Sequence, residues 1–317
     1  MAYSAGDSIL DDEYNTFVNS SSDPFGYNHF AGPGSGVYGL NQSTIATVSA
    51  GDTINASHWN SLFTGMDNIA NHTNISITAS SVSAGDTIAI RSALISDLAN
   101  LAAAVAGGST SATALGTNAV GSSTSAATYN TSATIERSVT FANNNTMRAF
   151  FNAGGKIRID PSVTTGIDGL KDDVFNDLTV TATGNLDIGS LTSTRSGSGE
   201  TLTTNGLAIG FHDLTDSYQT ILKLTSDNSG YTSNTVEYFA KLDAAVASAT
   251  VITIKMVATD AAGDTTYTAG NTDGVAANPN EAPKITLALI EVHPTNAQGL
   301  ASNIQSASNA EVSNSTS

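Results

Sequence analysis

Acidic side chains are the first residues of this chain whose types and spacing suggest chemistry. They cluster at Asp11-Asp12-Glu13 and at Asp172-Asp173. Two carboxyl groups that face each other across a groove, roughly 5 to 10 Å apart, can hydrolyse a glycosidic bond. Nothing in the sequence places a second carboxylate opposite either cluster. Acidic residues are also favoured in the first turn of a helix, near the positive end of its dipole, so we interpret both clusters as helix starts.

An acidic loop is the better candidate for binding an ion. Asp260, Asp264 and Asp273 fall within or beside one stretch, 259–282, that is rich in Asp, Gly, Thr and Asn. Calcium takes several oxygen ligands from such loops, although the spacing here does not fit the EF-hand. We expect no cofactor, with a calcium ion as the alternative, for which the carboxylates of these three residues are the candidate ligands.

Other catalytic signatures are missing from the sequence. The chain has no cysteine, which excludes disulfides, thiolate chemistry and zinc–cysteine sites. It contains no phosphate-binding loop, no H-E-x-x-H and no G-x-S-x-G. The five histidines are scattered: His29, His58, His72, His212 and His293. We therefore predict no catalytic residues and no enzymatic activity.

Composition narrows the class of protein further. Only 12% of the 317 residues are charged, about half the usual share, and such polar but uncharged surfaces are typical of adhesins and viral fibres. The net charge of −17 disfavours nucleic-acid and membrane partners. No apolar stretch approaches the roughly 18 residues of a membrane span, and no signal-peptide pattern is visible. We expect a protein that is made in a cytoplasm and released by lysis.

Three copies of a short motif organise the first 106 residues. The pattern S-A-G-D-[ST]-I occurs at 4–9, 49–54 and 83–88. Gly-Asp favours a turn, and each copy leads into a helix-like segment, which is clearest in the apolar stripe that begins at Trp59. We predict a repeated unit of turn, short strand and helix that serves docking or oligomerisation in region 1–106. The alternative is a shared local turn without a common role.

From about residue 135 the pattern changes to strands. Residues 107–134 are almost wholly Gly, Ser, Thr, Ala and Asn, which predicts a linker or an extended arm. Strand patterns follow at 134–142, 156–159, 178–182, 202–209, 218–224, 236–242, 250–258 and 284–292, with two short helices at 145–152 and 168–176. We predict an α+β, mostly β fold in which residues 135–294 form an antiparallel, jelly-roll-like β-sandwich. A polar C-terminal tail, 295–317, follows it.

Six residues are expected to act as structural anchors. They are Trp59, Phe150, Phe151, Gly154, Gly155 and Tyr218. The two phenylalanines are apolar residues for a core, the paired glycines end a helix, and the tyrosine begins a strand, where an aromatic ring packs across a sheet. These are folding roles, not chemical ones.

Some segments are more specific than these patterns. The stretch 138–158 contains M-R-A-F-F-N-A-G-G-K-I-R between two strand patterns, and 210–220 reads G-F-H-D-L-T-D-S-Y-Q-T. The first resembles a strand, R-x-F-F-N-x-G-G, strand pattern in structural proteins of tailed bacteriophages, notably those of marine cyanobacteria. The second is similar to a later segment of the same proteins, and the G-D-[ST]-I-x-x-x-x-[YW]-N pattern at 6–15 and 51–60 resembles their modules. This resemblance extends over more than half of the chain.

The resemblance implies a structural virion protein on the tail, baseplate, neck or fibre, and it carries over no catalytic residues. Such a protein would assemble with itself, a trimer being favoured by analogy with three-fold fibres, and with other virion proteins. Two alternatives stay open. One is a receptor- or glycan-binding adhesin at the tail tip that contacts the host surface, and the other is a capsid decoration protein.

Overall fold

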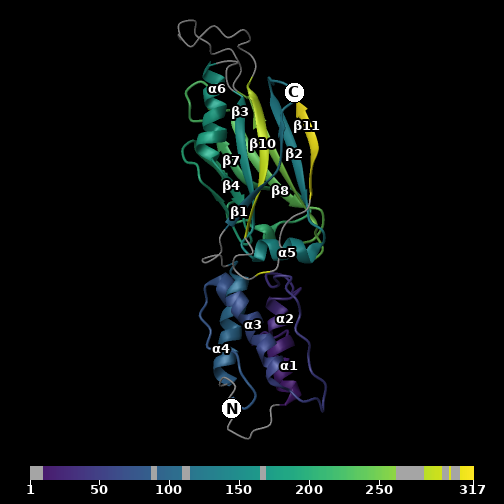
Figure 1. Cartoon of the computed structure of the whole chain (residues 1–317). Coiled ribbons are helices and arrows are strands. Elements are labelled where there is room, and N and C mark those ends of the chain that lie inside the picture. Colours follow the sequence, from purple (N-terminus) through teal and green to yellow (C-terminus); the bar gives the residue numbers. More distant parts are fainter. Residues whose placement is uncertain are drawn as a thin grey trace. The chain divides into compact units, whose positions relative to one another are not determined.

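The computed structural model of the chain is built from two compact units (Figure 1). It describes residues 10–86, 91–108, 115–164, 169–261, 282–294, 300 and 308–317. The first unit comprises residues 1–116, 143–155 and 293–305, and the second comprises 117–142, 156–292 and 306–317. The described part of the first is mainly helical and the second is mainly β. This confirms the predicted α+β, mostly β class.

The described part of the helical unit contains five helices, which share one apolar core. They are α1 (Asp11–Asn19), α2 (Tyr27–Phe30), α3 (Ala56–Thr73), α4 (Arg91–Ala106) and α5 (Asn144–Asn152). The apolar stripe predicted for α3 faces this core: Trp59 is 1% exposed, and Leu62 and Met66 are fully buried. Leu98 of α4 packs into the same cluster. Amphipathic periodicity therefore places α3 correctly.

Helix α5 belongs to the helical unit, although the sequence places it inside the β-domain. Asn152 donates a hydrogen bond to the carbonyl oxygen of Gly39 at 3.1 Å. Ala149 and Ala153 are fully buried in the apolar core of this unit, and Phe150 and Phe151 are also fully buried. The helix ends at Asn152, and Gly154, two residues later, has a φ of 87°, which favours glycine. The chain thus leaves the β-unit after β2, forms this short helix and returns as β3.

The second repeat shows how its helix begins. The side-chain oxygen of Asn55 accepts hydrogen bonds from the main-chain N–H groups of Ser57, at 3.1 Å, and His58, at 3.4 Å. This is an N-cap. The short strand expected between turn and helix is wrong for this copy, because residues 53–55 form no strand and lead directly into the cap. The corresponding residues of the third copy, 87–89, lie outside the described part of the chain, as do 8 and 9 of the first, where Leu10 precedes α1.

Asparagine side chains connect successive repeats. Asn15 donates to the carbonyl oxygen of Val48 at 2.8 Å and accepts from its N–H at 2.9 Å. Asn60 makes the same pair of bonds to Val82, at 2.9 and 2.8 Å. Each valine directly precedes the next S-A-G-D motif. The third repeat has Leu94 at the equivalent position, buried in the core, so these asparagine connections stop there.

The motif itself forms the same turn in both described copies. The carboxylate of Asp52 accepts from the N–H of Ser49 at 2.9 Å, and that of Asp86 accepts from Ser83 at 2.7 Å. The glycine of each turn has a positive φ, 91° in the second copy and 97° in the third. The repeat therefore encodes a turn held by its own aspartate.

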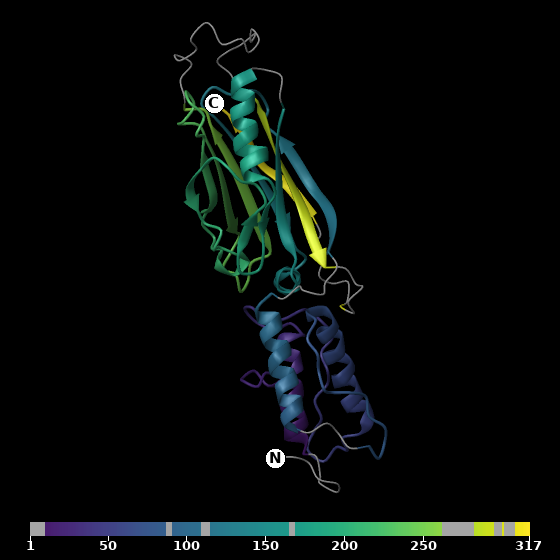
Figure 2. The same cartoon turned by 90° about the vertical axis from the view of Figure 1, so that its left-hand side faces the viewer.

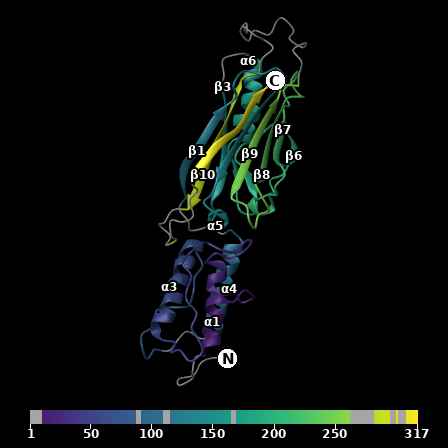
Figure 3. The same cartoon turned by 90° about the vertical axis from the view of Figure 1, so that its right-hand side faces the viewer.

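Two antiparallel sheets make up the β-unit (Figures 2 and 3). The five-stranded sheet has the order β1-β10-β3-β4-β5, and the six-stranded sheet has the order β11-β2-β9-β8-β7-β6. The strands are β1 (Leu115–Thr124), β2 (Ser132–Thr140), β3 (Lys156–Thr164), β4 (Leu186–Ile188), β5 (Ser193–Arg195), β6 (Thr201–Asn205), β7 (Gln219–Thr225), β8 (Thr235–Leu242), β9 (Val251–Thr259), β10 (Lys284–Pro294) and β11 (Ser308–Thr316).

Two strands lie where the sequence predicts irregular chain. The expected linker, 107–134, contains β1 and the start of β2, and the expected tail, 295–317, contains β11. Both β1 and β11 are edge strands with mostly exposed side chains. The side chain of Asn314, on β11, donates a hydrogen bond to the carbonyl oxygen of Thr124, on β1, at 2.8 Å and so connects the two edge strands. An edge strand needs main-chain pairing more than apolar side chains, which explains the linker-like composition.

The strand expected at 178–182 is wrong. Helix α6 (Gly169–Asn176) continues there as a π-helix, η1 (Asp177–Thr183). The hydroxyl of Thr183 donates to the carbonyl oxygen of Leu178 at 2.8 Å. Leu178 and Ala182 are fully buried, and η1 contacts β3 of one sheet and β7 and β8 of the other. Packing against both sheets overrides the β-branched composition of this segment.

Substituting Asn60 by alanine tests the connection between the second and third repeats. Asn60→Ala leaves the N–H and carbonyl of Val82 without their partner, so we expect the helical unit to lose about 1 to 3 kcal/mol of stability. Urea unfolding followed by circular dichroism measures the loss. Asn71→Ala is the matched control, because Asn71 is exposed and its side chain donates to the Asp67 carboxylate of the same helix, at 3.1 Å. Equal losses in the two variants would contradict the connecting role of Asn60.

Candidate functional site

One face of the six-stranded sheet carries a cluster of basic, aromatic and acidic side chains. Strand β8 alternates between partly exposed and buried residues along its whole length, and Lys255 of β9 lies on the partly exposed face. The apolar residues face the interior, so the polar ones are left on the outside. The members of this lysine–aromatic cluster are Glu136, Tyr218, Lys223, Glu237, Phe239, Lys241 and Lys255.

Strand register brings the cluster together from distant parts of the chain. Lys255 pairs with Glu136 of β2 on one side and with Phe239 of β8 on the other. Phe239 in turn lies opposite Thr220 of β7. Residues in one row of a sheet have side chains about 5 Å apart. Four strands therefore contribute to one continuous patch.

Two lysines lie over the aromatic rings. The Nζ atom of Lys255 is 3.9 Å from the centroid of the Tyr218 ring and 4.4 Å from that of Phe239. The Nζ atom of Lys241 is 4.6 Å from the Tyr218 ring. The two rings meet edge to face, with centroids 6.2 Å apart. These are cation–π distances, which hold the rings and ammonium groups in fixed positions.

Two carboxylates offset part of the positive charge of the three lysines in the cluster. Glu237 forms an ion pair with Lys223 at 3.1 Å and accepts a hydrogen bond from the Thr220 hydroxyl at 2.9 Å. Burial, and then a hydrogen bond with Glu136 and the charge of Glu136, raise the pKa of Tyr218, so its hydroxyl stays protonated at neutral pH. The patch thus places two aromatic rings, ammonium donors and carboxylate acceptors side by side. Such a surface can pack against the apolar edge of a sugar and hydrogen-bond its hydroxyl groups.

Of the three calcium candidates, only Asp260 lies within the described residues. The carboxylate of Asp260 forms an ion pair with Lys171 at 2.8 Å, and both side chains are buried. Asp264 and Asp273 lie outside the described residues. Within the described ranges, no group of three or more His, Asp or Glu side chains is placed to hold a metal ion.

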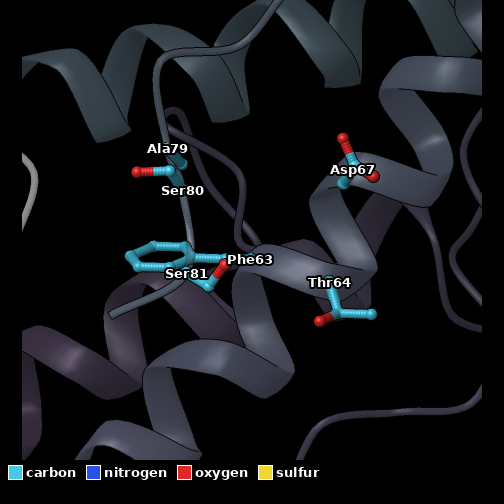
Figure 4. Close-up of a pocket in the computed structure, with 6 residues that line it drawn as sticks. All are labelled: Phe63, Thr64, Asp67, Ala79, Ser80 and Ser81. Atoms are coloured by element: carbon cyan, nitrogen blue, oxygen red, sulfur yellow. The ribbon is translucent and has the colours of Figure 1, made fainter. Parts of the chain in front are cut away.

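A hollow of about 300 Å³ lies in the helical unit (Figure 4). Phe63, Thr64 and Asp67 line it from α3, and residues 79–81 line it from the segment that follows. That segment is held by Asp97 of α4, whose carboxylate accepts from the N–H of Ala79 at 2.9 Å. The hollow offers one carboxylate and several hydroxyls, which suits hydrogen bonding to a small polar molecule.

Three of the histidines, His29, His58 and His72, take part in packing or in helix capping. His58 accepts from the N–H of Asn55 at 3.3 Å and completes the helix cap of α3. The ring of His29 stacks on Phe25, with centroids 4.4 Å apart. His72 is buried, and burial lowers its pKa to about 4, against the opposing effect of a hydrogen bond with the main chain of Ala153. His72 is therefore neutral at pH 7.

Sequence reasoning identified Tyr218 but missed its partners. The sequence signal for Phe239 and Lys241 was present, since they occupy alternate positions of a predicted strand whose other face is apolar. Lys255 could have been assigned to the outer face of its own strand in the same way. What the sequence does not contain is the register, which puts these residues opposite one another.

Comparisons with known protein families, with curated proteins and with solved structures found no match to this chain. Among the described residues, no helix is both long and apolar enough to cross a membrane.

The buried His72 predicts a specific pH dependence of stability. Its pKa is about 4 in the folded chain and about 6.5 when unfolded. The unfolded chain binds a proton below pH 6.5 that the folded chain does not bind until about pH 4. Stability is therefore lost as the pH falls through this window, by on the order of 3 kcal/mol. Unfolding of His72→Leu between pH 4 and 7 should show a flatter dependence, and an unchanged slope would contradict the assignment.

Proposed function

We propose that this chain is a non-catalytic structural protein of a tailed-bacteriophage virion. The observation that carries the proposal is that its most conspicuous polar motifs serve folding. The aspartates of the S-A-G-D repeats hold turns, and Asn15 and Asn60 connect one repeat to the next. A chain whose repeated polar residues hold its own main chain is suited to be a building block.

The resemblance of segments 138–158 and 210–220 to tailed-phage structural proteins supports the same proposal. In this proposal the helical unit docks to the particle and the β-unit is displayed. The chain assembles with copies of itself, as a trimer, and with other virion proteins. The net charge of −17 keeps such an assembly soluble and away from the genome.

Self-assembly of the full chain tests this proposal. We expect sedimentation equilibrium of the purified protein to give three times the chain mass, because fibre-like virion proteins close around a three-fold axis. Antibody labelling of a C-terminal tag on purified particles should then locate the protein on the tail, baseplate, neck or fibre. A monomer that associates with no particle and hydrolyses a capsule or cell-wall polymer would refute it, and labelling of the head would favour a capsid decoration protein.

A receptor- or glycan-binding adhesin is the second candidate. The lysine–aromatic cluster favours it, because the rings of Tyr218 and Phe239 lie among donors and acceptors on an outer sheet face. Aromatic rings bounded by charged groups give both stacking area and hydrogen bonds.

A glycan array probed with labelled full chain tests the adhesin candidate. If the cluster binds, Tyr218→Ala and Phe239→Ala should each weaken binding at least about tenfold, a loss of roughly 1.4 kcal/mol. Tyr231→Ala is the matched control, since Tyr231 lies in the turn between β7 and β8 and is not part of the cluster. Binding that survives both cluster substitutions, or no binding at all, would reject this site as a receptor platform.

A further inference from the structure

A lysine and an aspartate face each other inside the β-unit. Lys171 lies on α6, and Asp260 directly follows β9. The Lys171 Nζ and Asp260 Oδ2 atoms are 2.8 Å apart, and the two side chains are only 1% and 2% exposed. With a carboxyl C–O bond of about 1.2 Å, the nitrogen lies within about 4 Å of the carboxyl carbon. That is close to the separation of roughly 3 to 3.5 Å from which two groups react.

The surroundings of this pair are nearly closed to water. Val174 and Phe175, one helical turn after Lys171, are fully buried. The ring centroids of Tyr129 and Phe175 are 5.6 Å apart. Burial and then the negative charge of Asp260 raise the pKa of Tyr129, which shows that its hydroxyl shares the same interior and stays protonated. The pair thus lies in the interior of the β-unit, among other buried side chains.

Burial changes the reactivity of both partners. Two opposite charges in a poorly solvated interior are costly, and moving one proton from the ammonium to the carboxylate leaves a neutral amine beside a neutral carboxylic acid. The amine is then a nucleophile and the acid an electrophile, whereas the charged forms are neither. Exposed ion pairs remain charged because water stabilises them.

We propose that Lys171 and Asp260 condense to form an intramolecular isopeptide bond. The lone pair of the Lys171 nitrogen attacks the carboxyl carbon of Asp260, and a new N–C bond forms. One C–O bond then breaks, and the departing oxygen takes both protons lost by the ammonium group and leaves as water. The reaction consumes one ammonium and one carboxylate and yields one amide and one water, so it needs no cofactor, oxidant or reductant.

The bond would link α6 to the end of β9, two residues separated by 89 positions in the sequence. It would remove the buried charges and leave an amide, whose desolvation costs much less. A covalent link across so long a loop restricts the unfolded chain strongly. The inference concerns chemistry within the β-unit and does not depend on the virion proposal.

The mass of the denatured full chain tests this inference, because unfolding separates an ion pair but not an amide. Wild-type protein should be lighter than its sequence by one water, and its tryptic digest should contain one branched peptide that joins Lys171 to Asp260. Asp260→Asn has no carboxylate to take the proton from the ammonium group, so this variant should keep its full mass. Lys171→Arg keeps the positive charge but provides no amine of comparable reactivity, so this variant should keep its full mass.

A second ion pair in the same unit provides the control. Lys223 and Glu237 are 3.1 Å apart, with side chains 31% and 19% exposed. Trypsin should cleave after Lys223 normally, and Lys223→Arg should still lose one water. A wild-type chain of full mass with a free Lys171 would overturn the proposal, and so would loss of water by Lys171→Arg.

Discussion

The apolar space between the two sheets is the constraint on which the β-unit depends. Tyr238 of β8 and Met256 of β9 are fully buried, and side chains of a strand alternate between its faces. A shift of one residue in either strand would move Glu237 or Lys255 into that space, where an unpaired charge is very costly. The outward position of the lysine–aromatic cluster is therefore a consequence of what the inner face must bury.

Lys171 and Asp260 are an exception to this partition between apolar interior and polar surface. A buried ion pair adds little stability, because the loss of hydration offsets most of the attraction between the charges. Apolar residues of similar volume would serve packing at least as well. The presence of two charges at this position, supported by α6 and its π-helical continuation, is better explained by a reaction or a positional requirement than by packing alone. Lys171 differs in its burial from the other lysines of the unit, which are partly exposed.

The sequence predicts this fold well where burial has a period and poorly where it does not. Helix α3 has an apolar stripe at 3.6-residue spacing, and β8 alternates with a period of two, so both elements could be located. Strands β1 and β11 bury little, and their Ser, Thr, Asn and Gly composition matches that of a linker. The π-helix η1 resembles a strand in its β-branched residues because packing against both sheets, which no local pattern encodes, decides its conformation.

The candidate site and the buried pair were hidden from the sequence for a related reason. The contact between Lys171 and Asp260 spans 89 positions, so only the fold brings them together. The repeats behave differently, because the asparagine that connects two copies lies at a fixed distance from the motif and its partner is the residue before the next motif. Such an arrangement makes each repeat depend on the one before it. In the third repeat, Leu94 takes the place of the asparagine and is buried in the apolar core. The asparagines of the first two repeats therefore hold neighbouring repeats together, and the series of connections ends at the third repeat.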